Sequence, residues 1–390
     1  MIPLAVLWAL LGGQPAAVTA VPALVQAQVT PLARWVQQQE QARWLIPENL
    51  DRQRYPFTQT AHWQKVLWAV AVLEPQEPWI PEAIATLLPE AAQPHPEVAA
   101  QLLAVASQYR THPLVANRLR AIAQNTADRP WQGQIQRLLQ PEPIPPIPPL
   151  ADLLNWAIAP QPHLYVFCRP NRDVLCTAVL KDHHGQWVQE NGEFWSVPLL
   201  LQSVHRLPWS FPNGQTPQGL YRMEGLIPDP RRPQANPVPT AAEFLAYGQY
   251  PLIQLFFPTE KGQAQFLPHQ KGPFAGTLAQ YQALWPPTWQ THPPITQSYW
   301  AGLQGRTLLR IHGSGLATRH FGGWRGPQGW NPTLGCLAAR ETYDDVPQHD
   351  MPRLLSQLAG DRFAGYVVVV DVPGPDTPVA IADLPLPESR

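Results

Sequence analysis

The pattern of apolar residues changes along the chain from helical to strand-like. Between about residues 31 and 140, apolar runs recur at helical spacing at 63–73, 83–88, 98–109, 114–123 and 131–139, and prolines separate them. Proline is tolerated in the first turn of a helix and ends a helix elsewhere. The pattern therefore predicts short helices that pack into a small bundle.

After about residue 150 the pattern favours strands. Runs rich in β-branched and aromatic residues predict strands at 164–168, 174–180, 195–201, 252–257, 307–311 and 366–371. The polar turn at 170–173 between the first two strands is typical of a hairpin. Helices are expected at 240–246, 275–284 and 351–359. The predicted fold class is α+β, with an all-α N-terminal domain and a mainly β, sandwich- or barrel-like second domain.

A proline-rich segment at 141–150 lies at the change of pattern. Such a run favours polyproline II and acts as a semi-rigid spacer. We interpret it as a linker between a helical domain at 28–140 and a second domain at 151–390. An extended strip packed on the surface is the alternative.

The first residues bear on the compartment. Residues 2–11 form an apolar run that small residues follow, and it is too short to span a membrane. It resembles the apolar part of a signal peptide, although no Lys or Arg precedes it. We expect 1–27 to be a signal peptide of an extracytoplasmic protein, with no membrane span in the mature chain. The alternative is a short buried helix in a cytoplasmic protein.

Composition indicates a folded chain without a polyanionic partner. Hydrophobic residues make up 45% of the 390 residues, and 49 prolines are spread among segments that carry 16 tryptophans. The net charge of -1 provides no general attraction to nucleic acid or anionic membranes.

The cysteines are Cys168, Cys176 and Cys336, which are too few for a disulfide scaffold and form no CxxC motif. No metal site is predicted. Cys168 and Cys176 flank the expected hairpin, so they either form a cross-strand disulfide in an exported protein or pack within the strands. The odd count leaves at least one thiol unpaired.

Cys336 has the sequence context of a nucleophile. It follows Gly335, which would let a substrate carbonyl approach the backbone, and His312 lies at the end of an expected strand upstream. A cysteine nucleophile needs a neighbouring base and nearby N–H groups that can hold an oxyanion. This context makes His312 a candidate base for Cys336.

Three segments resemble the catalytic domain of the L,D-transpeptidases. Ile-His-Gly-Ser at 311–314 and Thr-Leu-Gly-Cys-Leu at 333–337 are similar to the family's His-Gly and Ser/Thr-x-Gly-Cys signature. Gln-Thr-Pro-Gln-Gly-Leu-Tyr at 215–221 resembles its Thr-Pro-x-Gly-x-Tyr/Phe segment, which precedes a core strand. Asp-Asp-Val at 344–346, a helix and the 366–370 strand complete the order. The resemblance covers about 163–373 and leaves the N-terminal 150 residues unexplained.

The resemblance implies a reaction and a site. Cys336 would attack the bond after the third residue of a peptidoglycan stem tetrapeptide, release D-alanine, and pass the acyl group to an amine. His312 would be the base, oriented by the carbonyl of Gly313 or Ser314, and N–H groups near Gly335 and Cys336 would line the oxyanion hole. No metal or organic cofactor is implied.

The sequence departs from the family pattern in ways that keep other functions open. Ala338 stands where Arg or Asn is common in the family. Thr333 replaces the Ser that begins the cysteine motif, and Leu334 replaces a frequent His, Lys or Arg. The loop from His312 to the cysteine is also longer than usual. Similar Ala-bearing members include hydrolases, so an L,D-carboxypeptidase or murein amide hydrolase is an alternative. A non-catalytic cell-wall scaffold is another, in which the helical domain would bind a protein or glycan partner.

Residues around the loop are candidates for substrate binding. They are Arg319, His320, Trp324, Arg325, Trp330 and Thr333. The arginines would either bind a substrate carboxylate or remain solvated, and the tryptophans would either wall the cleft or pin the loop. His320 is a second candidate for the base. Thr216, Pro217 and Gly219 are expected to shape a turn beside the cleft.

Overall fold

The computed structural model describes residues 50–60, 62–63, 66–67, 70, 79–92, 94–139, 146–158, 160–203, 209, 214–227, 248, 250–303, 305–314, 330–341 and 348–386. The expected signal peptide at 1–27 and the expected helix at 240–246 lie outside these residues. Helices and strands both occur in the described part, which agrees with an α+β fold class.

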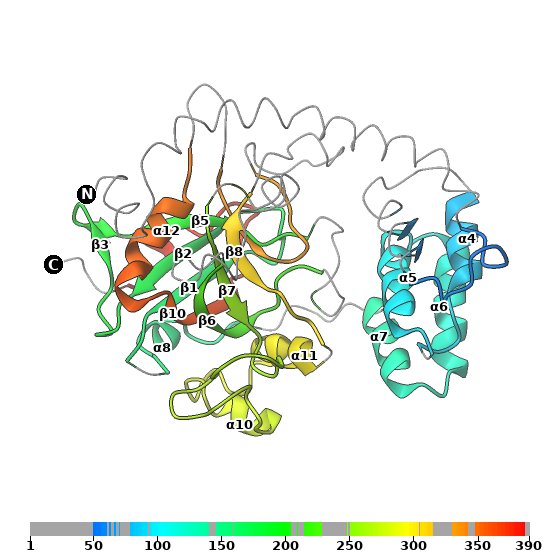
Figure 1. The fold of residues 1–390 in the computed structure, drawn as a ribbon, viewed down its shortest axis with the longest axis horizontal. Helices are drawn as coiled ribbons and strands as arrows, with labels where there is room; N and C mark the ends of the chain where they lie inside the picture. The colour runs from blue at the N-terminus through cyan, green and yellow to red at the C-terminus, as the bar shows by residue number, and fades with distance from the viewer. Residues whose placement is uncertain are drawn as a thin grey trace.

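The helices of the N-terminal part pack around one apolar core (Figure 1). They are α4 (Trp79–Leu87), α5 (Pro96–Gln108), α6 (Pro113–Asn125) and α7 (Arg129–Leu139). Both α5 and α6 begin at a proline, whose missing N–H is harmless in a first turn. The Asp128 carboxylate accepts a hydrogen bond of 3.1 Å from the Trp131 N–H at the start of α7. The buried rings of Trp63 and Trp131 belong to the core of this bundle.

In the described part of the chain, eight strands close into a barrel in the order β1-β10-β6-β7-β8-β9-β5-β2. The barrel strands are β1 (His163–Cys168), β2 (Cys176–Lys181), β5 (Ser196–Leu200), β6 (Gly219–Ile227), β7 (Leu252–Phe256), β8 (Arg310–Gly313), β9 (Leu337–Ala339) and β10 (Ala364–Asp371). β1 pairs with β10 in parallel, and β8 pairs with β9 in parallel. β3 (Gln189–Glu190) and β4 (Glu193–Phe194) form a separate two-stranded sheet.

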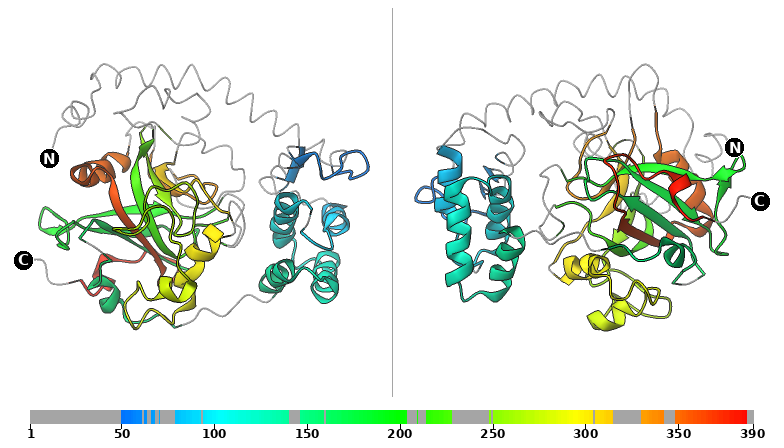
Figure 2. Two further views of the ribbon diagram at one scale, coloured as in Figure 1. Left: turned by 60° about the horizontal axis from the view of Figure 1, so that its bottom comes forward. Right: turned by 180° about the vertical axis from the view of Figure 1, so that it is seen from behind.

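Alternation along the strands divides their side chains between the barrel interior and its outer face. One cluster takes residues from each barrel strand, including Ile311 and Leu337, and α12 (Met351–Leu358) adds its apolar face to it. A second cluster, which includes Tyr165 and Tyr366, covers the other face of β1, β2, β6 and β10. The helices α8 (Leu150–Leu154), α10 (Leu278–Gln282) and α11 (Gln297–Leu303) contribute to this outer cluster. Figures 1 and 2 show α10 and α11 together on one side of the barrel and α12 on another.

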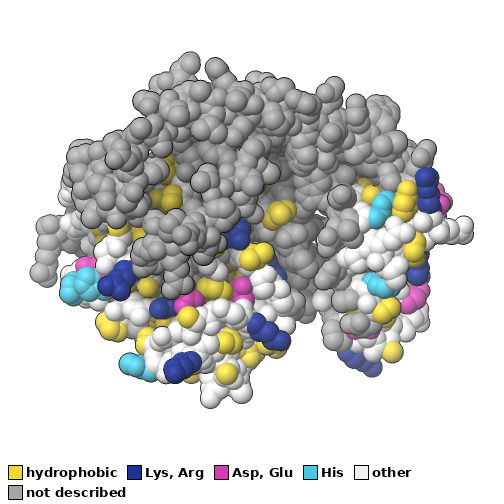
Figure 3. Space-filling model, in the orientation of Figure 1, with side chains coloured by type: hydrophobic (Ala, Val, Ile, Leu, Met, Phe, Trp, Pro, Cys, Tyr) yellow, Lys and Arg dark blue, Asp and Glu magenta, His cyan; other side chains and the backbone are white. Residues whose placement is uncertain are grey.

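Short 3-10 turns complete the described elements at Pro293–Thr296, Ala359–Asp361 and Ile381–Asp383. No helix among the described residues has both the length and the apolar character needed to cross a membrane. On the face drawn in Figure 3, the basic and acidic side chains of the described residues are interspersed.

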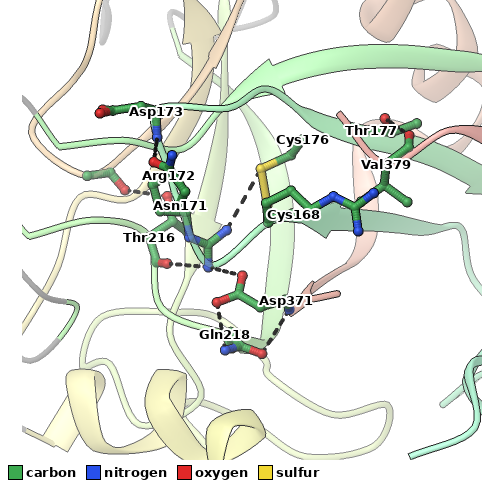
Figure 4. Close-up of a disulfide and its surroundings, with 12 residues drawn as sticks. Cys168, Asn171, Arg172, Asp173, Cys176, Thr177, Thr216, Gln218, Asp371 and Val379 are labelled. Carbon is green, nitrogen blue, oxygen red and sulfur yellow. Dashed lines mark hydrogen bonds and ion pairs between the residues drawn. A yellow bond between two sulfur atoms is a disulfide. The ribbon is translucent and has the colours of Figure 1, made fainter. Parts of the chain in front are cut away.

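Cys168 and Cys176 form a disulfide between the end of β1 and the start of β2, which decides between the two sequence interpretations (Figure 4). The loop between them carries Arg172, whose guanidinium is buried and makes an ion pair of 2.7 Å with Asp371 at the end of β10. Gln218 donates to the same carboxylate at 2.9 Å and accepts from the Asp371 N–H at 2.9 Å. The hairpin loop is thus fixed to one end of the barrel.

Two predicted elements differ from the structure near the site. The strand expected at 307–311 runs instead from Arg310 to Gly313, because Leu308 has a φ of 62°, which no extended strand adopts. The end of the expected linker is packed rather than free: Ile147 and Leu150 lie against the outer cluster, and the Trp289 indole donates to the Pro149 carbonyl at 3.1 Å. Residues 141–145 lie outside the described residues.

Candidate active site

Two neighbouring parallel strands bring His312 and Cys336 to one region of the barrel. His312 lies within β8, and Cys336 directly precedes β9. Ile311 pairs with Leu337 and His312 with Ala338, so His312 and Ala338 share the face opposite the barrel interior. Both candidate catalytic side chains are buried, with Cys336 8% exposed and His312 1% exposed.

The ring of His312 is oriented by its own strand. Its Nδ1 lies 2.6 Å from the carbonyl oxygen of Gly313. A carbonyl only accepts hydrogen bonds, so a neutral His312 carries its proton on Nδ1 and its lone pair on Nε2. Burial lowers the pKa of His312 to about 4, with the nearby Arg310 charge acting in the same direction and the Gly313 bond against it. The imidazole is therefore neutral, and Nε2 can accept a proton.

The thiol of Cys336 is held protonated by its surroundings. Burial raises its pKa, while the backbone N–H of Arg310 and the charges of Arg310 and Arg306 act in the opposite direction. The sulfur lies 3.7 Å from the Leu308 carbonyl oxygen, which is a hydrogen-bond acceptor for the thiol proton. A protonated thiol and a neutral imidazole are the starting forms for general-base catalysis, in which attack and deprotonation occur together.

The turn before Cys336 is tied by the hydroxyl of Thr333. This oxygen accepts from the Gly335 N–H at 3.0 Å and donates to the Cys336 carbonyl at 2.8 Å. Thr333 therefore shapes the turn, whereas the sequence suggested a contact with substrate. The Gly335 N–H is directed to Thr333 in this conformation, so it would have to turn away to serve an oxyanion as the resemblance implies.

Position 335 requires a glycine, both because of its backbone conformation and because there is no space for a side chain. Its φ is 100°, in a region that favours glycine. A Cβ at this position would lie 2.2 Å from the Gly214 carbonyl oxygen and 2.6 Å from Nη2 of Arg306. The Thr216 hydroxyl donates to the Gly335 carbonyl at 2.9 Å. The 214–216 segment thus packs directly on the residue before the nucleophile, which agrees with a turn-shaping role for Thr216.

A polar network supports the strand end after His312. The Ser314 N–H donates to the Ala339 carbonyl at 2.8 Å, and the Ser314 carbonyl accepts from Asn331 Nδ2 at 2.8 Å. Gly313 therefore supplies the carbonyl that contacts the histidine, and Ser314 links β8 to the segment before Cys336. The Glu341 N–H donates to the Ser314 hydroxyl at 3.2 Å.

Glu341 and Arg306 are buried charged residues that the sequence interpretation missed. A Cβ on Gly313 would lie 1.6 Å from Glu341 Oε2, so the carboxylate occupies the space that the glycine leaves open. Arg306 lies against Gly335 in the same way. Neither residue belongs to a motif, and their proximity to the site arises from contacts between distant segments. Gly313 alone offered a signal, since a glycine in a strand often marks a close approach.

Of the other residues that the sequence suggested for the site, some are packed in the structure and some lie outside the described residues. Trp330 is 3% exposed and packs with Leu200 and Ala338, so it pins the segment before Cys336. Ala338 is buried in the same cluster, which leaves no polar side chain at that position. The following predicted residues lie outside the described part of the chain: Arg319, His320, Trp324, Arg325 and the Asp-Asp-Val segment at 344–346.

The chain was compared with protein-family models, curated proteins and solved structures, and none of them matches it.

Proposed function

We propose that this chain is a cysteine acyltransferase of the L,D-transpeptidase type that acts on peptidoglycan stem tetrapeptides. One observation carries the proposal: His312, with Nδ1 bound to the Gly313 carbonyl, lies on the strand paired with the one that Cys336 precedes. Three of the segments that carry the family resemblance, 311–314, 333–337 and 215–221, lie together here. The finer fold assignment, an L,D-transpeptidase-like domain built on the barrel, is part of the same proposal.

In the proposed reaction, Nε2 of His312 accepts the thiol proton of Cys336 as the sulfur attacks. The sulfur attacks the carbonyl carbon of the third stem-peptide residue, and the bond to D-alanine breaks as the imidazolium returns its proton to the leaving amine. The product is a thioester on Cys336 and free D-alanine. An acceptor amine then attacks the thioester, loses a proton to His312, and releases the thiol.

Transfer to water is the second candidate outcome, and Ala338 is the observation that favours it. This residue is buried against Trp330 and Leu200 and presents no side-chain donor near the nucleophile. An acceptor amine must be held long enough to compete with water, and Ala338 contributes nothing to that binding. The enzyme would then be an L,D-carboxypeptidase or a murein amide hydrolase.

An extracytoplasmic location is proposed with the function. The Cys168–Cys176 disulfide supports it, because disulfides persist in oxidising compartments and are rare in the cytosol. The stem peptides that we propose as substrate lie in the same compartment. The helical domain would bind a protein or glycan partner there.

Intact-protein mass spectrometry tests the function. The purified chain is incubated with a disaccharide-tetrapeptide and, separately, with a carbapenem, which we expect to acylate Cys336. Both adducts should be absent from Cys336→Ala and should form far more slowly in His312→Asn. A well-folded protein without either adduct would exclude the proposal. Cross-linked dimers among the products would indicate transfer, and free tripeptide would indicate hydrolysis.

A further inference from the structure

Arg306 brings a buried positive charge to the segment that precedes Cys336. It lies in the loop between α11 and β8, is 8% exposed, and its backbone N–H donates to the Ala301 carbonyl at 3.0 Å. Its Nη1 donates to the carbonyls of Trp209 and Gln215 at 2.6 and 3.2 Å, and Nη2 donates to Gly214 at 2.9 Å. The guanidinium therefore binds the backbone of Trp209, Gly214 and Gln215.

The acceptors of the Arg306 side chain among the described residues are all backbone carbonyls, and none of them is a carboxylate that would neutralise its charge. Its side chain also lies over the Phe257 ring, with 5.5 Å between the guanidinium carbon and the ring centroid. Burial lowers the pKa of Arg306 to about 10, so the group stays charged at neutral pH. A negative charge that develops close to it would be stabilised strongly, since screening by water is weak at a buried position.

Cys336 is one of the groups on which this charge acts. The contact at Gly335 puts the Arg306 guanidinium beside the residue before Cys336, and the two side chains interact electrostatically. We propose that Arg306 is a positioning residue of this site, which holds the 214–215 backbone against Gly335 and stabilises the Cys336 thiolate. The use of that thiolate rests on the proposed function, whereas its stabilisation by Arg306 does not.

Other ionisable groups face the same region. Arg310 and His312 project from β8, and Tyr221 on β6 interacts with Arg306 but has a pKa raised well above its ordinary value by burial, so it stays neutral. Glu260 accepts from the Leu308 N–H at 3.4 Å, and burial raises its pKa to about 7. The charge of Arg310 lowers the pKa of Cys336 more than that of Arg306 does, so Arg306 adds to an effect that Arg310 leads.

The test is the pH dependence of Cys336 alkylation by iodoacetamide, followed by mass spectrometry. Arg306→Met keeps a similar length without the charge, and we expect the midpoint of its alkylation profile to rise by about one pH unit, so that the rate near neutral pH falls about tenfold. Arg306→Lys should keep its midpoint within about half a unit of the wild type. Arg353→Gln is the matched control, because Arg353 lies on α12 and pairs with Glu190.

Each outcome decides the proposal. A folded Arg306→Met with an unchanged midpoint would overturn it. If that variant does not fold, Arg306→Lys decides, and a rise of a full unit there would overturn it as well. The alkylation assay uses no stem peptide, so it is independent of the proposed function. If the wild type formed no adduct with the tetrapeptide but Arg306→Met raised the alkylation midpoint, the role of Arg306 would be supported and the proposed function would be excluded.

Discussion

The hydroxyl of Thr216 donates a hydrogen bond of 2.9 Å to the carbonyl of Gly335, which lies 119 residues later in the chain. Arg172 donates to the Thr216 carbonyl at 3.5 Å and pairs with Asp371 at 2.7 Å. The Thr-Pro segment, the disulfide loop and the nucleophile turn therefore form one connected structure at one end of the barrel. Breaking any of these interactions is expected to change the position of Cys336, although none of the residues involved is expected to contact a substrate.

Removing the Thr216 hydroxyl should slow acylation. Thr216→Val keeps the shape of the side chain but leaves the buried Gly335 carbonyl without this donor, which costs about 1–3 kcal/mol. We expect the acylation rate with a carbapenem to fall about two- to tenfold if half of that energy is lost in positioning the nucleophile. Thr216→Ser retains the hydroxyl and should recover most of the rate. Equal rates in the two variants would show that the bond does not position Gly335.

The sequence could predict the parts of this site that follow a local pattern. The alternation of apolar residues indicated β1 and β10 closely, and the resemblance to the L,D-transpeptidase signature singled out His312 and Cys336 as the candidate pair. β9 has only three residues, too few to show a period. The start of β8 was misplaced because the positive φ of Leu308 depends on its surroundings, which include the Glu260 carboxylate.

Contacts between distant segments could not be predicted in this way. Arg306 reaches Gly214 across 92 residues, and nothing in its neighbouring residues distinguishes it from a solvated loop arginine. Glu341 is similar, since only the folded chain brings its carboxylate against Gly313. Thr333 was predicted to bind substrate, and in the structure its hydroxyl makes hydrogen bonds within the turn.

The rate of acylation should decrease only in strongly acidic solution. Burial lowers the pKa of His312 to about 4, so the base form of the imidazole persists down to that pH. Below it the protonated ring cannot accept the thiol proton, and the rate should fall with a midpoint near 4. The rate is measured from pH 3 to 8 with the adduct as readout, and tryptophan fluorescence at each pH establishes that the protein is folded. A midpoint near 6.5, the ordinary pKa of histidine, would show that burial does not lower the pKa of His312.

The lowered pKa of His312 should also make the free energy of unfolding depend on pH. Because the folded pKa of His312 is lower than the unfolded value of 6.5, the unfolded chain binds more protons between about pH 4 and 6.5. The free energy of unfolding should therefore decrease as the pH falls through this window, by on the order of 3 kcal/mol for the full shift. His312→Asn should lack this component, while His163, whose pKa is also lowered by burial, contributes equally to both proteins. Urea unfolding at pH 7 and pH 4.5 measures the difference, and parallel losses in the two proteins would contradict it.

Gly335→Ala should abolish acylation even if the protein folds. The alanine would need a φ of 100°, and its Cβ would overlap the Gly214 carbonyl at 2.2 Å, so the turn must move and carry Cys336 with it. Gly185→Ala is the matched control, because Gly185 also has a positive φ, 76°, but has open space around it. We expect a loss of at least a hundredfold in the rate for Gly335→Ala and little change for Gly185→Ala, measured with the carbapenem adduct. Similar rates in both variants would show that the close packing at Gly335 is dispensable.

Reduction of the Cys168–Cys176 disulfide should destabilise the barrel and slow Cys336 as well. The bridge closes a short loop, with a sequence separation of 8, for which the chain-entropy model gives about 2.5 kcal/mol. That loop holds Arg172 against Thr216 and Asp371, so its release should loosen the contact with Gly335. The double variant Cys168→Ser/Cys176→Ser should unfold at a lower urea concentration than the oxidised wild type and should acylate more slowly under native conditions. Adding a reductant should shift the wild type toward the double variant and leave the double variant unchanged. A double variant that loses stability but acylates at the wild-type rate would separate the two effects and show that the hairpin loop does not reach the nucleophile through Thr216.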